Sequence, residues 1–399
     1  MLGIGFSIGK AYSTPRAPFV ALRETPIGDM AIGVFVFGGT TVTIEAENLR
    51  IGAEVKLPTP REVKSRHAAS DAVLRGVVEA RRQIKDILER RDHRLLVVVG
   101  PCSIHDPRAA LDYADRLSRL AVETRDTLYL VMRAYFEKPR TTTGWKGLIN
   151  DPYLDDTGRV EHGICLARRI LVDIAARGLA IATEALDPLT PQYLQDLIAW
   201  SAIGARTAES QPHREMASGL SSVVGLKNAT DGSVDVAVNA LKAVGKAHRF
   251  LGIDTLGRVA LVQTVGNPNA HIVLRGGEGG PNYGVRAIER CESRLLAANL
   301  PLNIMVDCSH DNSNKDHERQ CVVVDAVANQ VVDGNRSIIG IMVESNIEAG
   351  NQPIGRDLAY GVSVTDACVG WDDTEAMLRQ LATRLHEPLV QRLVPAKAS

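Results

Sequence analysis

Four residues of the metal-binding type stand out in this sequence. They supply one thiol, one imidazole and two carboxylates, a mixed ligand set that suits Mn, Fe, Co or Zn as a divalent ion. Such an ion would act as a Lewis acid. Taken one at a time, the thiol could be a packed side chain and the imidazole a structural loop residue, so the prediction requires all four to meet in the fold. They are Cys102, His310, Glu344 and Asp366.

Basic residues also occur where hydrophobic runs end. Four such cations in one place would repel one another unless a multiply charged anion lay among them, so they predict phosphate or carboxylate binding. The segment EKPRTTTGWKG adds Lys138, Arg140 and the hydroxyl of Thr141, enough for a second anionic group. The alternative is a set of solvated loop charges. The four cations are Arg133, Arg206, Lys227 and Arg275.

Eight short hydrophobic runs alternate, from about residue 95 onward, with stretches of helical periodicity. Each run ends in a polar residue, which is typical of a buried parallel strand that surfaces at its carboxyl end. Repeated βα units of this number predict an α/β fold, a (β/α)8 TIM barrel, with the residues above at its catalytic end. The runs are 95–104, 128–135, 180–186, 202–208, 222–228, 271–277, 302–310 and 337–345.

Helices are predicted between these strands from the amphipathic spacing of Ala, Leu and Arg. An open doubly wound sheet is the alternative arrangement of the same elements, but no glycine-rich nucleotide motif of the required form follows the first strand. The closed barrel is therefore favoured. The expected helices are 107–122, 162–177, 234–247, 284–299, 314–333 and 373–386.

Two segments fall outside the repeat. HRFLGIDTLGRVALVQTV (248–265) predicts a strand pair around a turn, inserted between the fifth and sixth barrel strands. Residues 1–60 are predicted to form an N-terminal extension, regulatory or partly disordered, ahead of a barrel domain over 61–399.

Composition narrows the classes of function. With 46 basic and 47 acidic residues, the net charge is −1, so no general field attracts nucleic acid or an anionic membrane. No apolar run approaches the roughly 20 residues that span a bilayer, and the N-terminus lacks a secretory pattern. Six cysteines without CxxC spacing argue against a zinc ribbon or disulfide framework. A cytoplasmic enzyme is expected.

Longer motifs surround these residues and are more specific than the residues alone. In combination they closely resemble type I 3-deoxy-D-arabino-heptulosonate 7-phosphate (DAHP) synthases over about residues 55 to 390. Residues 1 to about 45 do not resemble the usual N-terminal segment of that family. The motifs are GPCSIHDP (100–107), YFEKPRTTTGWKGLINDP (135–152), IGARTAESQPHRE (203–215), HIVLRGGEGGPNYG (271–284), MVDCSHDNSNKD (305–316), GIMVESNIEAGNQP (340–353) and YGVSVTDACVGW (360–371).

The resemblance implies a role for each matched position. Arg140 and Thr141 would hold the phosphate of erythrose 4-phosphate, and the backbone around Glu184 and Ala205 would assist in binding phosphoenolpyruvate. The metal ligands would be Cys102, His310, Glu344 and Asp366. The phosphate and carboxylate of phosphoenolpyruvate would be held by Arg133, Lys138, Arg206, Lys227 and Arg275.

The implied activity joins phosphoenolpyruvate, erythrose 4-phosphate and water to give DAHP and inorganic phosphate, the first step of the shikimate pathway. The metal would polarise the aldehyde, C3 of phosphoenolpyruvate would add to it, and water would attack C2 before phosphate leaves. Lys138 is a candidate proton donor to the aldehyde oxygen, while Cys102 and His310 would act through the metal. The family leads us to expect a homodimer or homotetramer.

Feedback inhibition by an aromatic amino acid is also common in the family. The resemblance implies an effector site built partly from the inserted strand pair and the segment around Ser221. Gly252 stands where phenylalanine-sensitive members tend to carry serine, and ATEALDPLTPQYL, which includes Gln192, resembles the tyrosine-sensitive subgroup. Tyrosine is therefore the expected inhibitor. The alternative is that Gly252 only serves the turn.

Two other functions remain open at this point. One is a 3-deoxy-octulosonate 8-phosphate synthase, which uses the same barrel chemistry on a five-carbon sugar, although the KPRTT sequence favours erythrose 4-phosphate. The other is a catalytically silent barrel that senses an aromatic amino acid, although the intact set of site residues argues against it.

Overall fold

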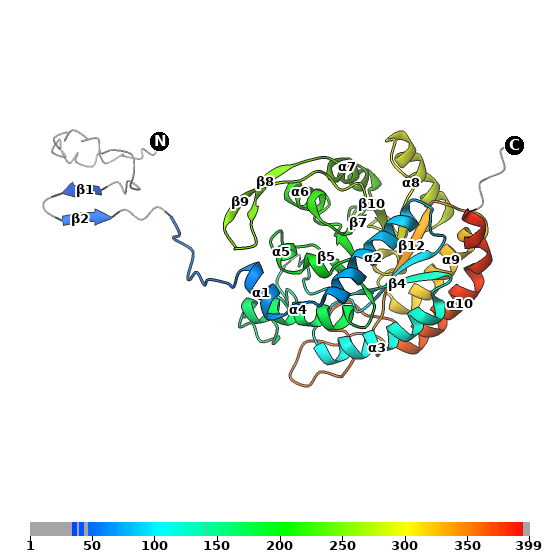
Figure 1. Cartoon of the computed structure of the whole chain (residues 1–399), viewed down its shortest axis with the longest axis horizontal. Coiled ribbons are helices and arrows are strands. Elements are labelled where there is room, and N and C mark those ends of the chain that lie inside the picture. Colours follow the sequence, from blue (N-terminus) through cyan, green and yellow to red (C-terminus); the bar gives the residue numbers. More distant parts are fainter. Residues whose placement is uncertain (1–33, 38–39, 44–46, 141, 394–399) are drawn as a thin grey trace, which may run out of the picture. The chain divides into compact units, whose positions relative to one another are not determined.

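Eight parallel strands close into a barrel in the computed structural model, which describes residues 34–37, 40–43, 47–140 and 142–393. Strand β12 pairs with β3 to complete the ring, and the predicted TIM barrel is confirmed (Figure 1). The strands are β3 (Leu95–Gly100), β4 (Leu128–Arg133), β5 (Ala180–Glu184), β6 (Trp200–Ile203), β7 (Val223–Lys227), β10 (Ala270–Leu274), β11 (Ile304–Asp307) and β12 (Ile338–Glu344).

The strands are buried on both faces, which explains their nearly continuous hydrophobic sequences. Leu96 and Val98 of β3 point into the barrel and join an inner cluster around Trp200, whereas Val97 packs outward in the larger cluster shared with the helices. Ile84 of α2 (Asp71–Leu88) belongs to the inner cluster. Helix α2 therefore covers the amino-terminal end of the barrel, opposite the catalytic end.

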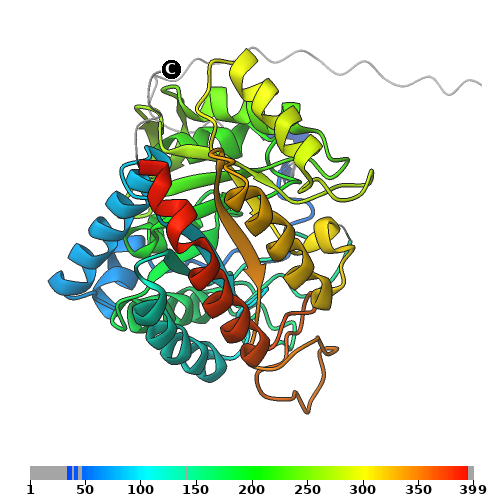
Figure 2. The same cartoon turned by 90° about the vertical axis from the view of Figure 1, so that its right-hand side faces the viewer.

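Helices surround the barrel, and their starts follow ordinary capping chemistry. The Asp106 side chain accepts a hydrogen bond from the backbone of Arg108 at the start of α3, where Pro107 takes the first helical position. Helices α9 (Gln320–Val332) and α10 (Trp371–Val390) lie side by side on the outer wall (Figure 2). The other helices are α1 (Pro60–Arg66), α3 (Pro107–Thr124), α4 (Val160–Ala175), α5 (Thr190–Leu194), η1 (Gln195–Leu197), α6 (Gln211–Gly219), α7 (Val234–Val244), α8 (Val285–Ala297), η2 (His310–Ser313), η3 (His317–Arg319) and η4 (Gln391–Leu393).

Two predicted boundaries differ most from the structure. The strand expected at 202–208 ends at Ile203, because the chain turns at once and the Thr207 amide donates back to the Gly204 carbonyl. The helix expected over 314–333 begins only at Gln320, since the preceding residues form two 3-10 turns around a left-handed backbone. Helices α1, α2, α5 and α6 were not predicted.

The inserted strand pair is present as expected. Strands β8 (Arg249–Ile253) and β9 (Val259–Gln263) form an antiparallel ribbon in which Leu251 faces Leu261 and Gly252 faces Ala260. The Arg61 amide donates to the Thr255 carbonyl in the turn of the ribbon, which ties it to α1.

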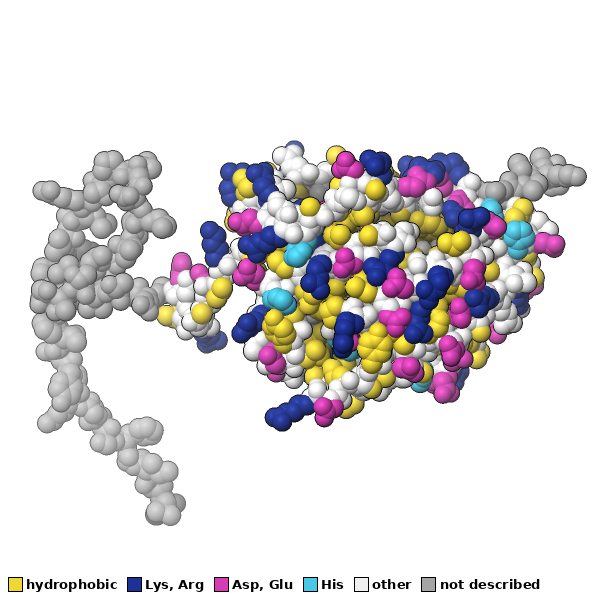
Figure 3. Space-filling view, turned by 60° about the horizontal axis from the view of Figure 1, so that its bottom comes forward, with side chains coloured by type: hydrophobic (Ala, Val, Ile, Leu, Met, Phe, Trp, Pro, Cys, Tyr) yellow, Lys and Arg dark blue, Asp and Glu magenta, His cyan; other side chains and the backbone are white. Residues whose placement is uncertain are grey.

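The chain divides into two units, Met1–Lys56 and Leu57–Ser399. The described part of the first unit contains a short antiparallel pair, β1 (Val34–Phe37) and β2 (Thr40–Thr43). On the face of the second unit shown in Figure 3, basic and acidic side chains are interspersed. Among the described helices, none combines the length and apolar character that a membrane crossing requires.

Candidate active site

A cavity of about 780 Å³ opens at the carboxyl-terminal end of the barrel strands. Cys102 and Arg133 are buried directly behind its wall, with 0% and 1% of their surface exposed. The structure therefore brings residues from all around the barrel to one place. The predicted site residues that line the cavity are Lys138, Arg140, Glu184, Ala205, Arg206, Lys227, Arg275, His310, Glu344 and Asp366.

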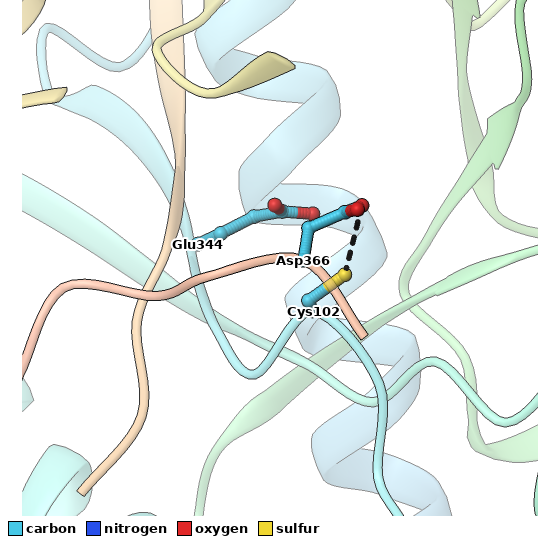
Figure 4. A group of neighbouring side chains, drawn as sticks. All are labelled: Cys102, Glu344 and Asp366. Carbon is cyan, nitrogen blue, oxygen red and sulfur yellow. Dashed lines mark hydrogen bonds between the residues drawn. The ribbon is translucent and has the colours of Figure 1, made fainter. Parts of the chain in front are cut away.

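Three of the four predicted metal ligands form a tight group. The ligand atoms of Cys102, Glu344 and Asp366 all lie within 4.8 Å of one another (Figure 4). The Cys102 thiol donates to Asp366 Oδ2 at 3.4 Å. The fourth, His310, stands at the edge of this group, with its Nε2 atom 3.9 Å from Glu344 Oε1. One sulfur, one nitrogen and carboxylate oxygens in this proximity fit a divalent ion of the transition series.

Hydrogen bonds behind the group hold its loops in place. Ser103 and Thr365 share a buried hydrogen bond of 2.7 Å, which joins the loop that carries Cys102 to the loop that carries Asp366. Gln320 exchanges two hydrogen bonds with the backbone of Glu344, at 2.9 and 3.0 Å. Partners of this kind orient ligand side chains, and the sequence analysis did not identify them.

His310 has an unusual backbone. Its φ is +55°, in the left-handed region that non-glycine residues seldom adopt, and residues such as this often occur at functional sites. Its Nδ1 atom lies 2.9 Å from Asp307 Oδ2 and 2.6 Å from the Ser309 hydroxyl. Nε2 is therefore the ring nitrogen left to face the Glu344 side.

Carboxylates neutralise three of the predicted cations, which changes the electrostatic expectation. Mutual repulsion among the cations was expected, but three acids that the sequence analysis did not pair with them lie within salt-bridge distance. Both members of two of these pairs are almost fully buried. The pairs are Arg133 with Glu344 at 2.9 Å, Lys227 with Asp307 at 2.9 Å and Arg275 with Asp311 at 2.5 Å.

The pKa of Asp307 is strongly perturbed. Burial by itself would raise its pKa, but the charges of His310 and Lys227 hold the pKa well below its usual range. The carboxylate is thus ionised at neutral pH, and it fixes two predicted site residues at once.

Lys138, one of the basic residues of the cavity, contacts Cys102, one of the proposed metal ligands. The Lys138 Nζ atom lies 3.0 Å from Cys102 Sγ. Burial raises the pKa of the Cys102 thiol to about 12, Glu344 adds to this effect, and Lys138 opposes it. Burial disfavours the ammonium form of Lys138, but Cys102, Glu344 and Asp366 outweigh burial and raise its pKa. A metal that binds Cys102 would displace the thiol proton.

The loop that carries Arg140 is pinned by its own hydrogen bonds. Arg140 Nε donates to the Trp145 carbonyl at 2.8 Å, and Trp145 donates to the Asp151 carbonyl at 2.8 Å. The Lys138 amide donates to the Lys146 carbonyl, which closes the loop. Arg140 is exposed at the cavity wall. Thr141 lies outside the described residues.

Glu184 lies against the turn that carries Ala205 and Arg206. A Cβ atom at Gly204 would stand 2.4 Å from Glu184 Oε1, so a larger residue here would require the Glu184 side chain to shift. Arg206 is exposed toward the cavity, and it forms no ion pair with any residue in the described ranges.

The predicted effector residues lie on three different elements, away from the lining of the cavity. Gln192 is in α5, the exposed Ser221 follows α6, and Gly252 is in β8. Ser218 at the end of α6 shares a 2.7 Å hydrogen bond with Thr264, so the segment before Ser221 does contact the inserted ribbon.

Comparison with known proteins points to one family. Residues 67–379 match the model of the DAHP synthetase I family. The Tyr-sensitive phospho-2-dehydro-3-deoxyheptonate aldolase of Salmonella typhimurium is 55% identical over 87% of this chain and 98% of its own length. The Phe-sensitive enzyme of that name from Escherichia coli K12 is 50% identical over 84% of this chain and 96% of its own.

A solved structure agrees with the sequence comparison. The phospho-2-dehydro-3-deoxyheptonate aldolase of Francisella tularensis SCHU S4 has a TM-score of 0.82 and 45% identity, covering 84% of this chain and 98% of its own. With the barrel, the cavity and these matches together, the chain belongs to the DAHP synthetase I family.

Proposed function

We propose that this protein is a metal-dependent DAHP synthase that joins phosphoenolpyruvate to erythrose 4-phosphate. The observation that carries the proposal is the meeting of Cys102, Glu344 and Asp366 beside a cavity lined by cations. A divalent ion held by these three residues and His310 would supply a Lewis acid for the aldehyde. We propose Mn, Fe, Co or Zn from the ligand types.

The cations of the cavity would position two anionic substrates against their mutual repulsion. Arg133, Lys227 and Arg275 are held by carboxylates, so they are fixed in place for the phosphate and carboxylate of phosphoenolpyruvate. Arg206 and Arg140 form no ion pair with any other described residue. Each can therefore take up substrate charge directly, Arg206 for phosphoenolpyruvate and Arg140 for the sugar phosphate.

The bond changes follow from this placement. C3 of phosphoenolpyruvate adds to the aldehyde carbon, and the aldehyde oxygen takes a proton. Water adds to C2 and gives up one proton, and the C2–O bond to phosphate then breaks as the new C2 hydroxyl loses its proton to form the keto group. Lys138 is the proposed proton donor to the aldehyde oxygen, since its ammonium lies 3.0 Å from Cys102 Sγ and so stands beside the residues that would hold the metal. Glu184 and the backbone at Ala205 would border phosphoenolpyruvate.

We further propose feedback inhibition by tyrosine. The chain is more similar to the Tyr-sensitive relative than to the Phe-sensitive one, which supports tyrosine as the effector. Gly252 supports it as well, because phenylalanine-sensitive members tend to carry serine at this position. We also propose that the protein is cytoplasmic and that it assembles as a homodimer or homotetramer.

Phosphate release tests the reaction. Protein treated with EDTA should release no phosphate from phosphoenolpyruvate, and added Mn or Co should restore release with erythrose 4-phosphate. A greater rate with a five-carbon sugar phosphate would instead favour an octulosonate synthase. Tight tyrosine binding without phosphate release under any metal would favour a silent sensor.

A further inference from the structure

A tyrosine ring covers one face of the Arg133 guanidinium. Arg133 is the last residue of β4, Tyr135 follows it by two residues, and the ring belongs to the inner cluster of the barrel. The Arg133 Cζ atom lies 4.0 Å from the centre of the Tyr135 ring. Both side chains are buried. A guanidinium over an aromatic face at this distance makes a cation–π contact, which is strongest where water is excluded.

The ring leaves the hydrogen-bonding edge of the guanidinium accessible, because it contacts the face and not the N–H groups. Those N–H groups donate to the Pro101 carbonyl at 3.4 Å, the Met342 sulfur at 2.8 Å and Glu344 at 2.9 Å. A guanidinium has five N–H donors. Two donors of Arg133 are therefore left, within the described part of the chain, for a substrate anion.

The hydroxyl of Tyr135 does not explain the position of the ring. It is buried and has no hydrogen-bond partner among the described residues. Burial raises the pKa of the phenol, so Tyr135 is neutral at pH 7 and offers Arg133 no negative charge. The aromatic face is thus the part of the side chain that contacts the guanidinium.

Glu344 is the one acid in the described ranges that lies within salt-bridge distance of Arg133. The same carboxylate belongs to the group of proposed metal ligands. A carboxylate that binds a divalent ion shares its charge with that ion, so it compensates a neighbouring arginine less. The Tyr135 ring contacts Arg133 without being a metal ligand, and its attraction does not depend on that carboxylate.

We propose that Tyr135 is a positioning residue, which stacks on the Arg133 guanidinium and holds it in the orientation that binds phosphoenolpyruvate. The inference rests on the proposed function, since that function assigns phosphoenolpyruvate to Arg133. The alternative is that Tyr135 only fills space in the inner cluster beside Trp200. Packing depends on the size and shape of the ring, whereas the cation–π contact depends on the negative charge of its face.

Rings of similar shape and different charge separate the two roles. Tyr135→Phe keeps the aromatic face, so the Kd for phosphoenolpyruvate should stay within about twofold of the wild type. Pentafluorophenylalanine introduced at position 135 keeps the shape but reverses the charge of the face, so the Kd should rise by roughly 30-fold. Isothermal titration calorimetry with phosphoenolpyruvate, in EDTA and again with Mn, measures the Kd without turnover.

Tyr129 of the same strand gives a matched control. Its ring lies 4.8 Å from the Arg94 Cζ atom, at the amino-terminal end of β4 and so at the opposite end of the barrel. Pentafluorophenylalanine at position 129 should leave the Kd for phosphoenolpyruvate unchanged.

Two outcomes would overturn the inference. An equal Kd for phenylalanine and pentafluorophenylalanine at position 135 would leave Tyr135 as a packing residue. A large rise with Tyr135→Phe alone would assign the effect to the hydroxyl. Wild-type protein that binds no phosphoenolpyruvate would instead overturn the proposed function on which the inference rests.

Discussion

The ammonium of Lys227 lies 2.9 Å from the carboxylate of Asp307, and both side chains are almost fully buried behind the candidate active site. The same oxygen of Asp307 lies 2.9 Å from Nδ1 of His310. Asp307 thus joins a proposed substrate-binding cation to a proposed metal ligand. A single carboxylate sets the position of both groups.

We expect Asp307→Asn to lower the free energy of unfolding by about 3–5 kcal/mol at pH 7, because it leaves Lys227 as an uncompensated buried charge. The folded-state pKa of Asp307 lies below its unfolded value near 4, so its contribution is present above that pH and is lost as the pH falls through the folded pKa. Urea unfolding in EDTA should therefore show a smaller difference between variant and wild type below pH 4. Asp325→Asn, at an exposed acid, is the control.

Cys102→Ala should abolish metal-dependent turnover. Loss of an outer partner of a metal ligand already costs about 10–100-fold in affinity, so loss of a ligand should cost at least 100-fold. Metal content after dialysis, measured together with the rate of phosphate release, checks the expectation. Cys291→Ala removes another buried thiol, in α8, and should retain metal. Wild-type rates in the Cys102 variant would refute the ligand assignment.

Much of the barrel could be predicted because each buried strand has a hydrophobic sequence and a polar end. That pattern located Cys102, Lys227 and Glu344 at one end of the barrel. Asp307 was missed because it lies in the run 302–310, from which only His310 was taken as a candidate site residue. Its pairing with Lys227 joins β11 to β7, and these strands are not neighbours in the sequence or in the barrel. Such a contact depends on the closed ring.

Other misses had signals in the sequence. Helix α2 has a capping serine, Ser70, and an amphipathic face, but it precedes the first strand and so lay outside the repeat on which the prediction depended. The strand expected over 202–208 was too long, because the sequence after Ile203 still resembles a buried strand with a polar end. The turn at Gly204 brings the chain against Glu184 of β5, a contact that no local sequence pattern shows.

Glu137 offers a pH test at a buried acid near the cavity. Burial raises its pKa to about 8, and Asp187 adds to the effect. The folded state therefore holds a proton that the unfolded state releases between about pH 4 and pH 8, so stability falls as the pH rises through that window. Glu137→Gln should remove a slope of up to about 1.4 kcal/mol per pH unit. Chemical denaturation at pH 5, 6.5 and 8 measures it.

A comparison with Glu289→Gln isolates the effect of burial, since Glu289 is an exposed acid of α8. That variant should follow the wild-type pH dependence. If Glu137→Gln does so as well, the Glu137 carboxyl is not protonated in the folded protein at neutral pH.

Gly252→Ser should weaken tyrosine inhibition with little change in turnover. A Cβ atom at this position would lie 2.8 Å from Val262 Cγ2, so the Val262 side chain must shift to admit any larger residue. Gly252→Ala tests this crowding without the hydroxyl. Inhibition curves with tyrosine and phenylalanine for both variants separate the two effects, and undiminished tyrosine inhibition in both would exclude Gly252 from the effector site.

Arg140 and Arg206, the two cavity arginines without an ion pair among the described residues, should each bind a different substrate. Arg140→Met should raise KM for erythrose 4-phosphate, and Arg206→Met should raise KM for phosphoenolpyruvate. A lost hydrogen bond to a charged group costs about 1.5–3 kcal/mol, or roughly 10- to 150-fold. Arg356→Met removes an exposed charge outside the cavity lining and controls for general electrostatics. Steady-state kinetics with each substrate varied in turn give the answer. Equal increases in KM for both substrates in both variants would contradict these separate roles. They would show that only the total positive charge of the cavity affects substrate binding.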